Sequence, residues 1–410
     1  MVDESVLAIN SSVQFDESIS HYEIHAHQPY GSSSFNNSDE IRITIQNQDL
    51  FILPSKSFLH ISGKLSKKNT QTAPTKVKLV HNAMCHMFDE IRYEINGIEV
   101  DKSKNVGVTS TIKNYLSINA STNLENAGWM SIDENVQLTN DDGYFDVCIP
   151  LKMLLGFAED YKKIIVNAKH EIILIRSRND INSIIPNDDT VVAEEQIDIN
   201  IMKIEWLIPY VMLSNKQKIE MMKYIQKDPL ISIGFRSWEL YEYPLLPRTN
   251  KHIWTIKTAS QLEKPRYVIL VFQTNRKNQW NKNANNFDHC NISDVKLHLN
   301  SQIYPYGNLN LDINKNQFAL LYEMYANFSE SYYGNQQQFS ISKEIFKSKL
   351  PFIVIDCSRQ NEMLKSGPVD VRLEFESKEN FPADTSAYCL IIHDRILEYK
   401  PISGIIRKLI

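Results

Sequence analysis

Apolar residues alternate strictly with polar residues over many short stretches of this chain, and this period of two constrains the fold most strongly. Ile41, Ile43 and Ile45 each stand between polar residues, and the same alternation recurs at residues 91–95, 295–299 and 369–375. Successive side chains of a strand point to opposite faces, so this pattern predicts one packed face and one solvent face. It is typical of antiparallel sheets. We therefore predict an all-β chain built as sandwiches or barrels, without β-α-β units.

Helical spacing is confined to a few short segments. The clearest one runs from Ser214 to Lys227, where Ser214 and Gln217 match a capping box and Pro229 ends the pattern. Two other segments with this spacing are 151–161 and 318–328. We interpret their apolar stripes as core packing, and predict a few short helices in the loops between strands.

The two halves of the chain show the same succession of strand-like segments. Five pairs match in order: 22–28 with 238–244, 58–62 with 267–271, 88–96 with 292–300, 171–177 with 371–377, and 204–206 with 397–399. The offset falls steadily along the chain, which indicates a duplicated domain with shorter loops in the second copy. We predict an N-terminal arm over 1–14, β-domains over 15–210 and 211–410, and a linker helix near 214–227. About eight strands in each half fit a jelly roll.

Composition and motif searches exclude several classes of protein. Glycine contributes only 12 of 410 residues, and the chain contains no GxGxxG, GxxxxGK[ST], HExxH or GxSxG motif. Dinucleotide binding, nucleotide hydrolysis, zinc proteolysis and α/β-hydrolase chemistry therefore lose their usual support. The formal net charge of −5 argues against a protein that coats nucleic acid, because such proteins are usually basic.

Cysteine usage and hydrophobic runs predict a chain made in a reducing compartment that is soluble or, at most, peripheral to a membrane. The five cysteines, at 85, 148, 290, 357 and 389, are odd in number and include no close pair, which argues against a disulfide framework. The acidic first residues lack the apolar segment of a secretory signal. The longest clean apolar run, Tyr267–Phe272, is far shorter than the ~20 residues that span a bilayer.

One histidine pair is the best candidate for a metal site. His25 and His27 lie two residues apart and so share one strand face with Glu23. A cupin would place a carboxylate a few residues later, but Gly31 and Ser32 stand there. We interpret the pair as histidines on the polar face, in solvent or at an interface, with Tyr22, Ile24 and Ala26 facing the core; a metal site is the alternative.

The remaining candidate groups are incomplete as chemical sites. His81, Cys85 and His86 lie close together, as do His289 and Cys290, but no CxxC pair accompanies them. We predict that Cys85 and Cys290 are buried small apolar residues before equivalent strands.

The acidic and basic residues of the sequence do not supply a group of catalytic side chains either. Asp141 and Asp142 are interpreted as part of a turn, and Glu159 and Asp160 are adjacent in sequence, which says nothing about spatial pairing. The segment 276–282 mixes basic residues with Trp280 and is interpreted as a solvated loop rather than a nucleic-acid reader. The basic, apolar segment 405–410 fits a frayed tail, a subunit contact or an acidic membrane surface. We assign no catalytic, cofactor-binding or metal-binding residue and predict no enzymatic activity.

Several segments together resemble one family of capsid proteins. The longest is DVCIPLKMLLGFAEDY, residues 146–161. The others are 88–97, 170–177, 265–273 and 295–300. In this order they resemble the major capsid proteins of Maverick/Polinton-type elements and adintoviruses.

This resemblance implies two tandem jelly rolls, the double jelly-roll class shared with adenovirus and tectivirus capsids. It implies a homotrimer that forms a pseudo-hexameric capsomer of an icosahedral shell, without cofactor or catalytic site. The partners it implies are other copies of the chain, neighbouring capsomers and a vertex or minor capsid protein, with no sequence-specific binding of nucleic acid. The protein would be made inside the cell, assemble in the cytoplasm or nucleus, and reside in the virion.

Two other classes stay open at this point. A duplicated β-sandwich module that binds a glycan or a protein would expose an aromatic platform on one sheet face. A jelly-roll enzyme would need the metal ligands that the sequence does not complete.

Overall fold

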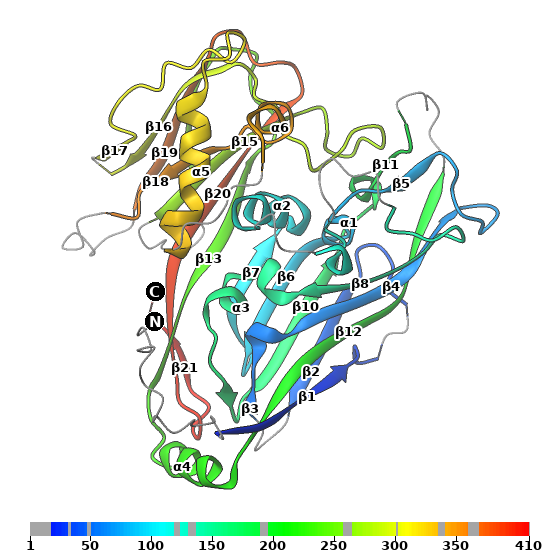
Figure 1. The fold of residues 1–410 in the computed structure, drawn as a ribbon, viewed down its shortest axis with the longest axis vertical. Helices are drawn as coiled ribbons and strands as arrows, with labels where there is room; N and C mark the ends of the chain where they lie inside the picture. The colour runs from blue at the N-terminus through cyan, green and yellow to red at the C-terminus, as the bar shows by residue number, and fades with distance from the viewer. Residues whose placement is uncertain are drawn as a thin grey trace, which may run out of the picture.

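Antiparallel strands dominate the chain and form two sandwiches (Figure 1). The computed structural model describes residues 18–31, 34–46, 51–118, 124–129, 137–188, 196–256, 265–300, 302–334, 341–359 and 369–409. The predicted arm over 1–14 lies outside these residues.

The first sandwich is built from residues before α4. One of its sheets has the order β8 (Tyr144–Pro150), β4 (Phe58–Lys67), β12 (Ile197–Leu213), β3 (Phe51–Ile52) and β9 (Ile165–Val166), with β1 (Ile19–His27) also paired to β12. The facing sheet has the order β2 (Glu40–Gln46), β10 (Lys169–Arg176), β6 (Phe88–Ile95) and β7 (Ile98–Lys104). A small separate ribbon joins β5 (Val77–Leu79) to β11 (Ile184–Pro186).

The second sandwich repeats this plan. Its first sheet has the order β13 (Ile231–Tyr243), β20 (Thr385–Tyr399), β15 (Pro265–Thr274) and β18 (Ile353–Asp356), with β21 (Ile406–Lys408) also paired to β20. Its second sheet has the order β14 (Lys251–Ile256), β19 (Val371–Ser377), β16 (Ile292–Leu299) and β17 (Gln302–Tyr304).

The two sandwiches share one strand order. Counting the eight main strands of each, one sheet pairs strands in the order first, eighth, third, sixth, and the other in the order second, seventh, fourth, fifth. This interleaving is the jelly-roll arrangement, in which two sheets face each other and most edges are closed. The predicted fold class, two tandem eight-stranded jelly rolls with short helices in loops, is confirmed.

The five matched segment pairs all fall on equivalent strands, but not all of them are in equivalent register. Ile91 pairs with Leu174 in the first sandwich, and Val295 pairs with Phe375 in the second. This shifts the 171–177 match by one residue. The segment 204–206 lies in the middle of β12, whereas 397–399 lies at the end of β20. Bulges and unequal strand lengths, which the residue pattern does not reveal, account for the difference.

The helices lie in the connections between strands. They are α1 (Ala83–His86), α2 (Val106–Ser117), α3 (Gly156–Asp160), α4 (Asn215–Ile225), α5 (Ala319–Tyr333) and α6 (Lys343–Lys349). Helix α4 lies where the sequence predicts one, with Ser214 at the N-cap position, but the Ser214 side chain makes no capping hydrogen bond. None of the helices in the described residues is long and apolar enough to cross a bilayer.

The chain cannot be divided at a single residue into two separate cores, because each half contributes side chains to the core of the other. Ile233 and Phe235 of β13, with Leu397 and Tyr399 of β20, pack into the core of the first sandwich. Residues of α2, such as Ile112, pack in the opposite direction, into the core of the second. The long strands β13 and β20 therefore run along both sandwiches (Figure 1).

Strand β15 departs from the alternating pattern. Every residue from Tyr267 to Phe272 is buried, because α5 covers the outer face of its sheet. Phe328 of α5, for example, contacts Tyr267 with ring centroids 5.0 Å apart. A strand covered on both faces is continuously apolar, whereas a strand with one wet face alternates.

Candidate functional site: the junction between the two sandwiches

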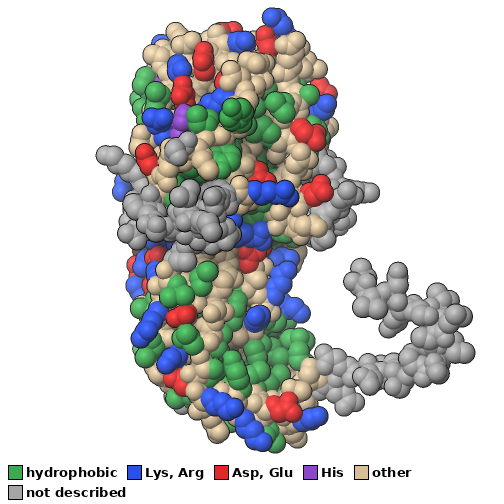
Figure 2. All heavy atoms as spheres, turned by 90° about the vertical axis from the view of Figure 1, so that its left-hand side faces the viewer, with side chains coloured by type: hydrophobic (Ala, Val, Ile, Leu, Met, Phe, Trp, Pro, Cys, Tyr) green, Lys and Arg blue, Asp and Glu red, His purple; other side chains and the backbone are tan. Residues whose placement is uncertain are grey.

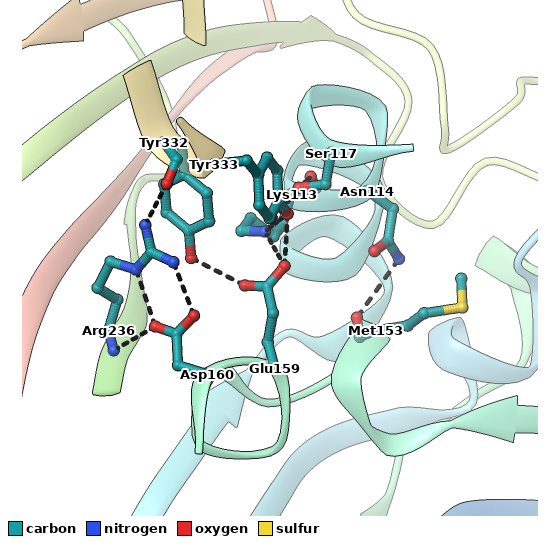
Figure 3. A network of polar contacts seen from close by, with 9 residues as sticks. All are labelled: Lys113, Asn114, Ser117, Met153, Glu159, Asp160, Arg236, Tyr332 and Tyr333. Carbon is teal, nitrogen blue, oxygen red and sulfur yellow. Dashed lines mark hydrogen bonds and ion pairs between the residues drawn. The ribbon is translucent and has the colours of Figure 1, made fainter. Parts of the chain in front are cut away.

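A lysine buried between the sandwiches is the centre of the first polar cluster at the junction (Figure 3). Lys113 of α2 has a side chain that is 1% exposed. Its ammonium group donates to Glu159 Oε1 at 2.9 Å, to Ser117 Oγ at 2.6 Å and to the Tyr333 hydroxyl at 3.2 Å. It also lies 4.5 Å from the centre of the Trp238 ring, a cation–π distance.

The carboxylate of Glu159 joins three elements. It accepts hydrogen bonds from the hydroxyls of Tyr332, at 2.8 Å, and of Tyr333, both on α5, in addition to the bond from Lys113. Burial lowers the pKa of Lys113, and Glu159 partly offsets that effect. Burial likewise raises the pKa of both tyrosines, so they remain protonated donors. The buried charge is therefore paired and fully hydrogen-bonded, as burial of a charge requires.

Arg236 of β13 forms the second ion pair of this cluster. Its guanidinium binds Asp160 of α3 in a bidentate manner, with Nε–Oδ2 at 2.8 Å and Nη2–Oδ1 at 2.7 Å. Its Nη1 donates to the carbonyl oxygen of Tyr332 at 2.7 Å, and the guanidinium stacks 3.5 Å from the centre of that ring. Burial alone would lower the pKa of Arg236, but the bonds to Asp160 raise it above its usual value.

Close backbone approach requires glycine at the start of α3. A Cβ atom at Gly156 would lie 1.8 Å from the carbonyl oxygen of Arg236. The first turn of α3 therefore packs directly on β13, and this contact fixes the distance over which the Arg236–Asp160 pair forms.

A second polar cluster joins α1 and α2 to a loop of the second sandwich. Asn285 Nδ2 donates to the carbonyl oxygen of His81 at 2.6 Å. Its Oδ1 accepts from His86 Nε2 at 2.8 Å and from Thr111 Oγ1 at 2.7 Å. The Tyr115 hydroxyl completes the cluster with a 2.6 Å bond to His81 Nε2.

Burial keeps the two histidines of this cluster neutral. It lowers the pKa of His81 to about 3, helped by repulsion from His86 and Lys349, and lowers the pKa of His86 to about 4. Both rings act as fixed hydrogen-bonding groups near neutral pH.

The junction has the properties of a structural joint. Its charged groups satisfy one another, and each cluster draws side chains from both sandwiches. Among the described residues, no group of three or more His, Cys, Asp or Glu side chains is placed to hold a metal ion. The arrangement can hold the two sandwiches in one relative orientation, through ion pairs and hydrogen bonds that are costly to break when buried.

The predicted orientation of β1 is wrong. Tyr22 and Ile24 are exposed, at 46% and 58%. His25 and His27 lie opposite Ile208 and Trp206 of β12, which are buried in the first core, so they share the inner side of the sheet. The His25 ring packs 4.3 Å from the Tyr210 ring, and His27 Nε2 lies 3.0 Å from the Tyr210 hydroxyl. Because β1 lies at a sheet edge, neither of its faces is fully covered, and alternation alone does not show which face is inward.

Glu23 bonds to two histidine rings of β1. Its carboxylate contacts the rings of His21 and His25, each at 3.0 Å. Hydrogen bonding to His25, and then to His21, lowers the pKa of Glu23. The interpretation of His25 and His27 as a solvent or interface pair stays a prediction.

Cys85 and the turn at Asp141 and Asp142 lie as the sequence predicts, whereas Cys290 is less buried than expected. Cys85 is buried, and burial raises the pKa of its thiol to about 12. Cys290 is partly buried against the second core, and burial raises its pKa to about 12 as well. Asp141 and Asp142 form a turn before β8, in which Asn140 Oδ1 accepts from the backbone of Asp142 and Tyr144.

The basic segment 276–282 is occupied by contacts within the chain. Arg276 pairs with Asp288 at 2.5 Å, and Lys277 pairs with Glu242 at 2.7 Å. Trp280 packs against the first core. The aromatic ring that a single-stranded nucleic acid would stack on is therefore used inside the fold.

No sequence pattern predicts the junction residues Lys113, Arg236 and Asn285. Their partners Glu159, Asp160 and His81 lie 46, 76 and 204 residues away in the chain, so no local pattern marks these contacts. A polar residue within an apolar helical stripe, such as Lys113 in α2, is the one signal that could have pointed to a buried charge.

The strand order and the two joined sandwiches define a double jelly-roll protein. A family model described as "Double jelly roll-like domain" matches residues 77–397, well over half of the chain. The chain therefore belongs to the double jelly roll-like domain family. No curated protein matches the sequence.

Solved structures from three viruses share this fold. A chain from the Sputnik virophage has a TM-score of 0.63 at 10% identity, covering 100% of this chain and 92% of that one. The PBCV-1 virus capsid gives a TM-score of 0.59 at 10% identity, with 98% and 99% covered. The mavirus major capsid protein gives 0.58 at 14% identity, with 100% and 95% covered.

Proposed function

We propose that this chain is a structural major capsid protein, of the Maverick/Polinton and adintovirus type, that forms trimeric capsomers of an icosahedral shell. The observation that carries the proposal is the shared strand order of its two sandwiches. Two of the structures that share this fold are the PBCV-1 virus capsid and the mavirus major capsid protein.

The geometry makes this role physically sensible. Three copies, each with two sandwiches of similar outline, supply six similar corners around one axis, and a rotational interface closes such a ring. The six corners keep fixed positions only if the two sandwiches of each copy do not move against each other. The buried Lys113–Glu159 and Arg236–Asp160 pairs supply that rigidity.

The remaining parts of the proposal follow from this role. We take 15–210 and 211–410 as the two structural units, with α4 as the connection, although side chains of each unit complete the core of the other. The chain would act without enzymatic activity, reside in the virion, and contact neighbouring capsomers and a vertex or minor capsid protein. A duplicated binding module is not favoured, because the similar structures are viral.

Mass measurement in solution tests the proposal. Size-exclusion chromatography with light scattering is expected to give roughly three times the chain mass of 47.5 kDa. A stable monomer at micromolar concentration would contradict the capsid role.

A further inference from the structure

One end of the molecule carries exposed apolar side chains among basic ones. We call this surface the basal face; it is formed by α4, residues 226–230, the turn 400–405 and β21 (Figure 1). Figure 2 shows hydrophobic side chains gathered on the lower part of one side of the molecule, with lysines and arginines around them. Its exposed apolar members are Ile219, Met222 and Tyr224 of α4, together with Leu230, Ile402, Ile405 and Leu409.

Specific contacts join the parts of this face. Asp228 Oδ1 accepts hydrogen bonds from the backbone of Ile402, at 2.9 Å, and of Ser403, at 3.3 Å. Strand β21 pairs with the end of β20, which in turn pairs with the start of β13 directly after residue 230. The apolar residues of α4 and of the C-terminal turn therefore belong to one continuous surface.

Helix α4 presents apolar side chains on both of its sides. Met221 and Ile225 pack inward against a small cluster of Phe51, Leu53 and Val211. Ile219 and Met222 point the other way and are 55% and 43% exposed. A surface helix that is fully used by its own fold would have a polar outer side, and within the described residues nothing covers the outer Ile219 and Met222.

Lysines surround these two side chains. Lys216, Lys223 and Lys227 share the outer side of α4 with Ile219 and Met222, given three- and four-residue spacing. None of the three forms an ion pair within the part of the chain that the structure describes. Residues 400–409 add three basic side chains and no acidic one, although the whole chain carries a net charge of −5. With Glu220 and Asp228 as its two acidic residues against seven lysines and arginines, the basal face is net positive.

Basic side chains around exposed aliphatic ones are the chemistry of a surface that binds anionic lipid. We propose that the basal face binds the surface of an anionic bilayer, with Ile219 and Met222 entering the headgroup region and the three lysines contacting lipid phosphates. A nucleic acid would gain nothing from Ile219 and Met222, because phosphate contacts need only charge and bases stack on aromatic rings, of which α4 carries one, Tyr224. The inference uses the surface of one chain and does not depend on the capsid role.

Flotation with lipid vesicles tests this assignment on the full chain. The protein is expected to float with vesicles of phosphatidylcholine and phosphatidylserine, not with phosphatidylcholine alone, and to release as salt rises. Ile219→Ser with Met222→Ser, and separately Lys216→Gln with Lys223→Gln and Lys227→Gln, should each weaken binding about tenfold or more. Ile253→Ser, at a 61% exposed position of β14 on another face, is the matched control and should bind as the natural chain does.

Several results would overturn the assignment. These are equal flotation with neutral and anionic vesicles, undiminished binding by both variants, and absence of flotation. If vesicles do not bind but a DNA duplex binds through the same three lysines, the face serves nucleic acid. If instead the Ile219 and Met222 variant loses its oligomeric mass, the face is a subunit contact. The variants replace exposed side chains, and circular dichroism confirms that each is folded before binding is compared.

Discussion

The side-chain amide of Asn285, in the second sandwich, bonds to both His81 and His86 of the first. Its Nδ2 lies 2.6 Å from the carbonyl oxygen of His81, and its Oδ1 lies 2.8 Å from His86 Nε2. Asn285 is completely buried. One amide thus connects two sequence segments that are some 200 residues apart, and neither segment indicates its partner.

Replacement of this amide should loosen the joint. Asn285→Ala removes the bonds to His81, His86 and Thr111 and leaves their buried polar atoms without partners, so it should lower the free energy of unfolding by about 2–4 kcal/mol. Chemical denaturation measures the change. Asn308→Ala, at an exposed asparagine of the same sandwich, is the control and should change it by less than about 0.5 kcal/mol. Equal effects of the two substitutions would show that Asn285 does not join the sandwiches.

Acid should destabilise the fold through its buried histidines. Burial lowers the pKa of His81 to about 3 and that of His86 to about 4, from an ordinary value of 6.5. Between those values the unfolded chain binds protons that the folded chain excludes, so stability is complete above pH 6.5 and falls as the pH drops towards 3. His170, whose pKa burial lowers to about 3, adds to the fall.

A variant without one of these titrations isolates the effect. His86→Gln keeps an amide donor but cannot bind a proton. Between pH 6 and 4, the slope of its unfolding free energy against pH should therefore be smaller than that of the natural chain by about 1.4 kcal/mol per pH unit. Denaturation midpoints across this range provide the measurement. A slope identical to that of the natural chain would rule out His86 as a source of acid sensitivity.

Removal of one partner from the buried ion pair should cost more than removal of both. Lys113→Met leaves the Glu159 carboxylate buried without its cation and should lower the free energy of unfolding by about 3–5 kcal/mol. Adding Glu159→Gln should restore much of that loss, and a double-mutant cycle gives the coupling. The exposed pair Lys251–Glu374 is the control, because Lys251→Met there should cost below about 1 kcal/mol. Additive effects of the two junction substitutions would contradict the buried pair.

The contact of α3 with β13 predicts a strong effect of a single methyl group. Gly156→Ala places Cβ against the carbonyl oxygen of Arg236 and should cost about 1–3 kcal/mol or more, because backbone has to move. Gly234→Ala lies on β13 itself, with no atom within 4 Å of the added Cβ, and should be neutral or slightly stabilising. Thermal unfolding compares them, and a neutral Gly156→Ala would mean that the two elements do not touch.

The sequence predicts the strands more readily than the joint between the sandwiches. Alternation at 41–45 and 295–299 marks strands with one wet face, and the collinear segments fall on equivalent strands. The pattern cannot show which face of β1 is inward, because Tyr22 and His25 both lie at a sheet edge and are exposed. The joint depends on pairs such as Arg236–Asp160, which only the complete fold brings together.

Electron microscopy of the purified protein tests the central claim most directly. If three chains with two equivalent sandwiches each form a closed ring, class averages viewed along the axis should show six similar lobes, with threefold symmetry in their finer detail. Particles with two lobes at the same concentration, or rings whose number of lobes is not six, would contradict the account.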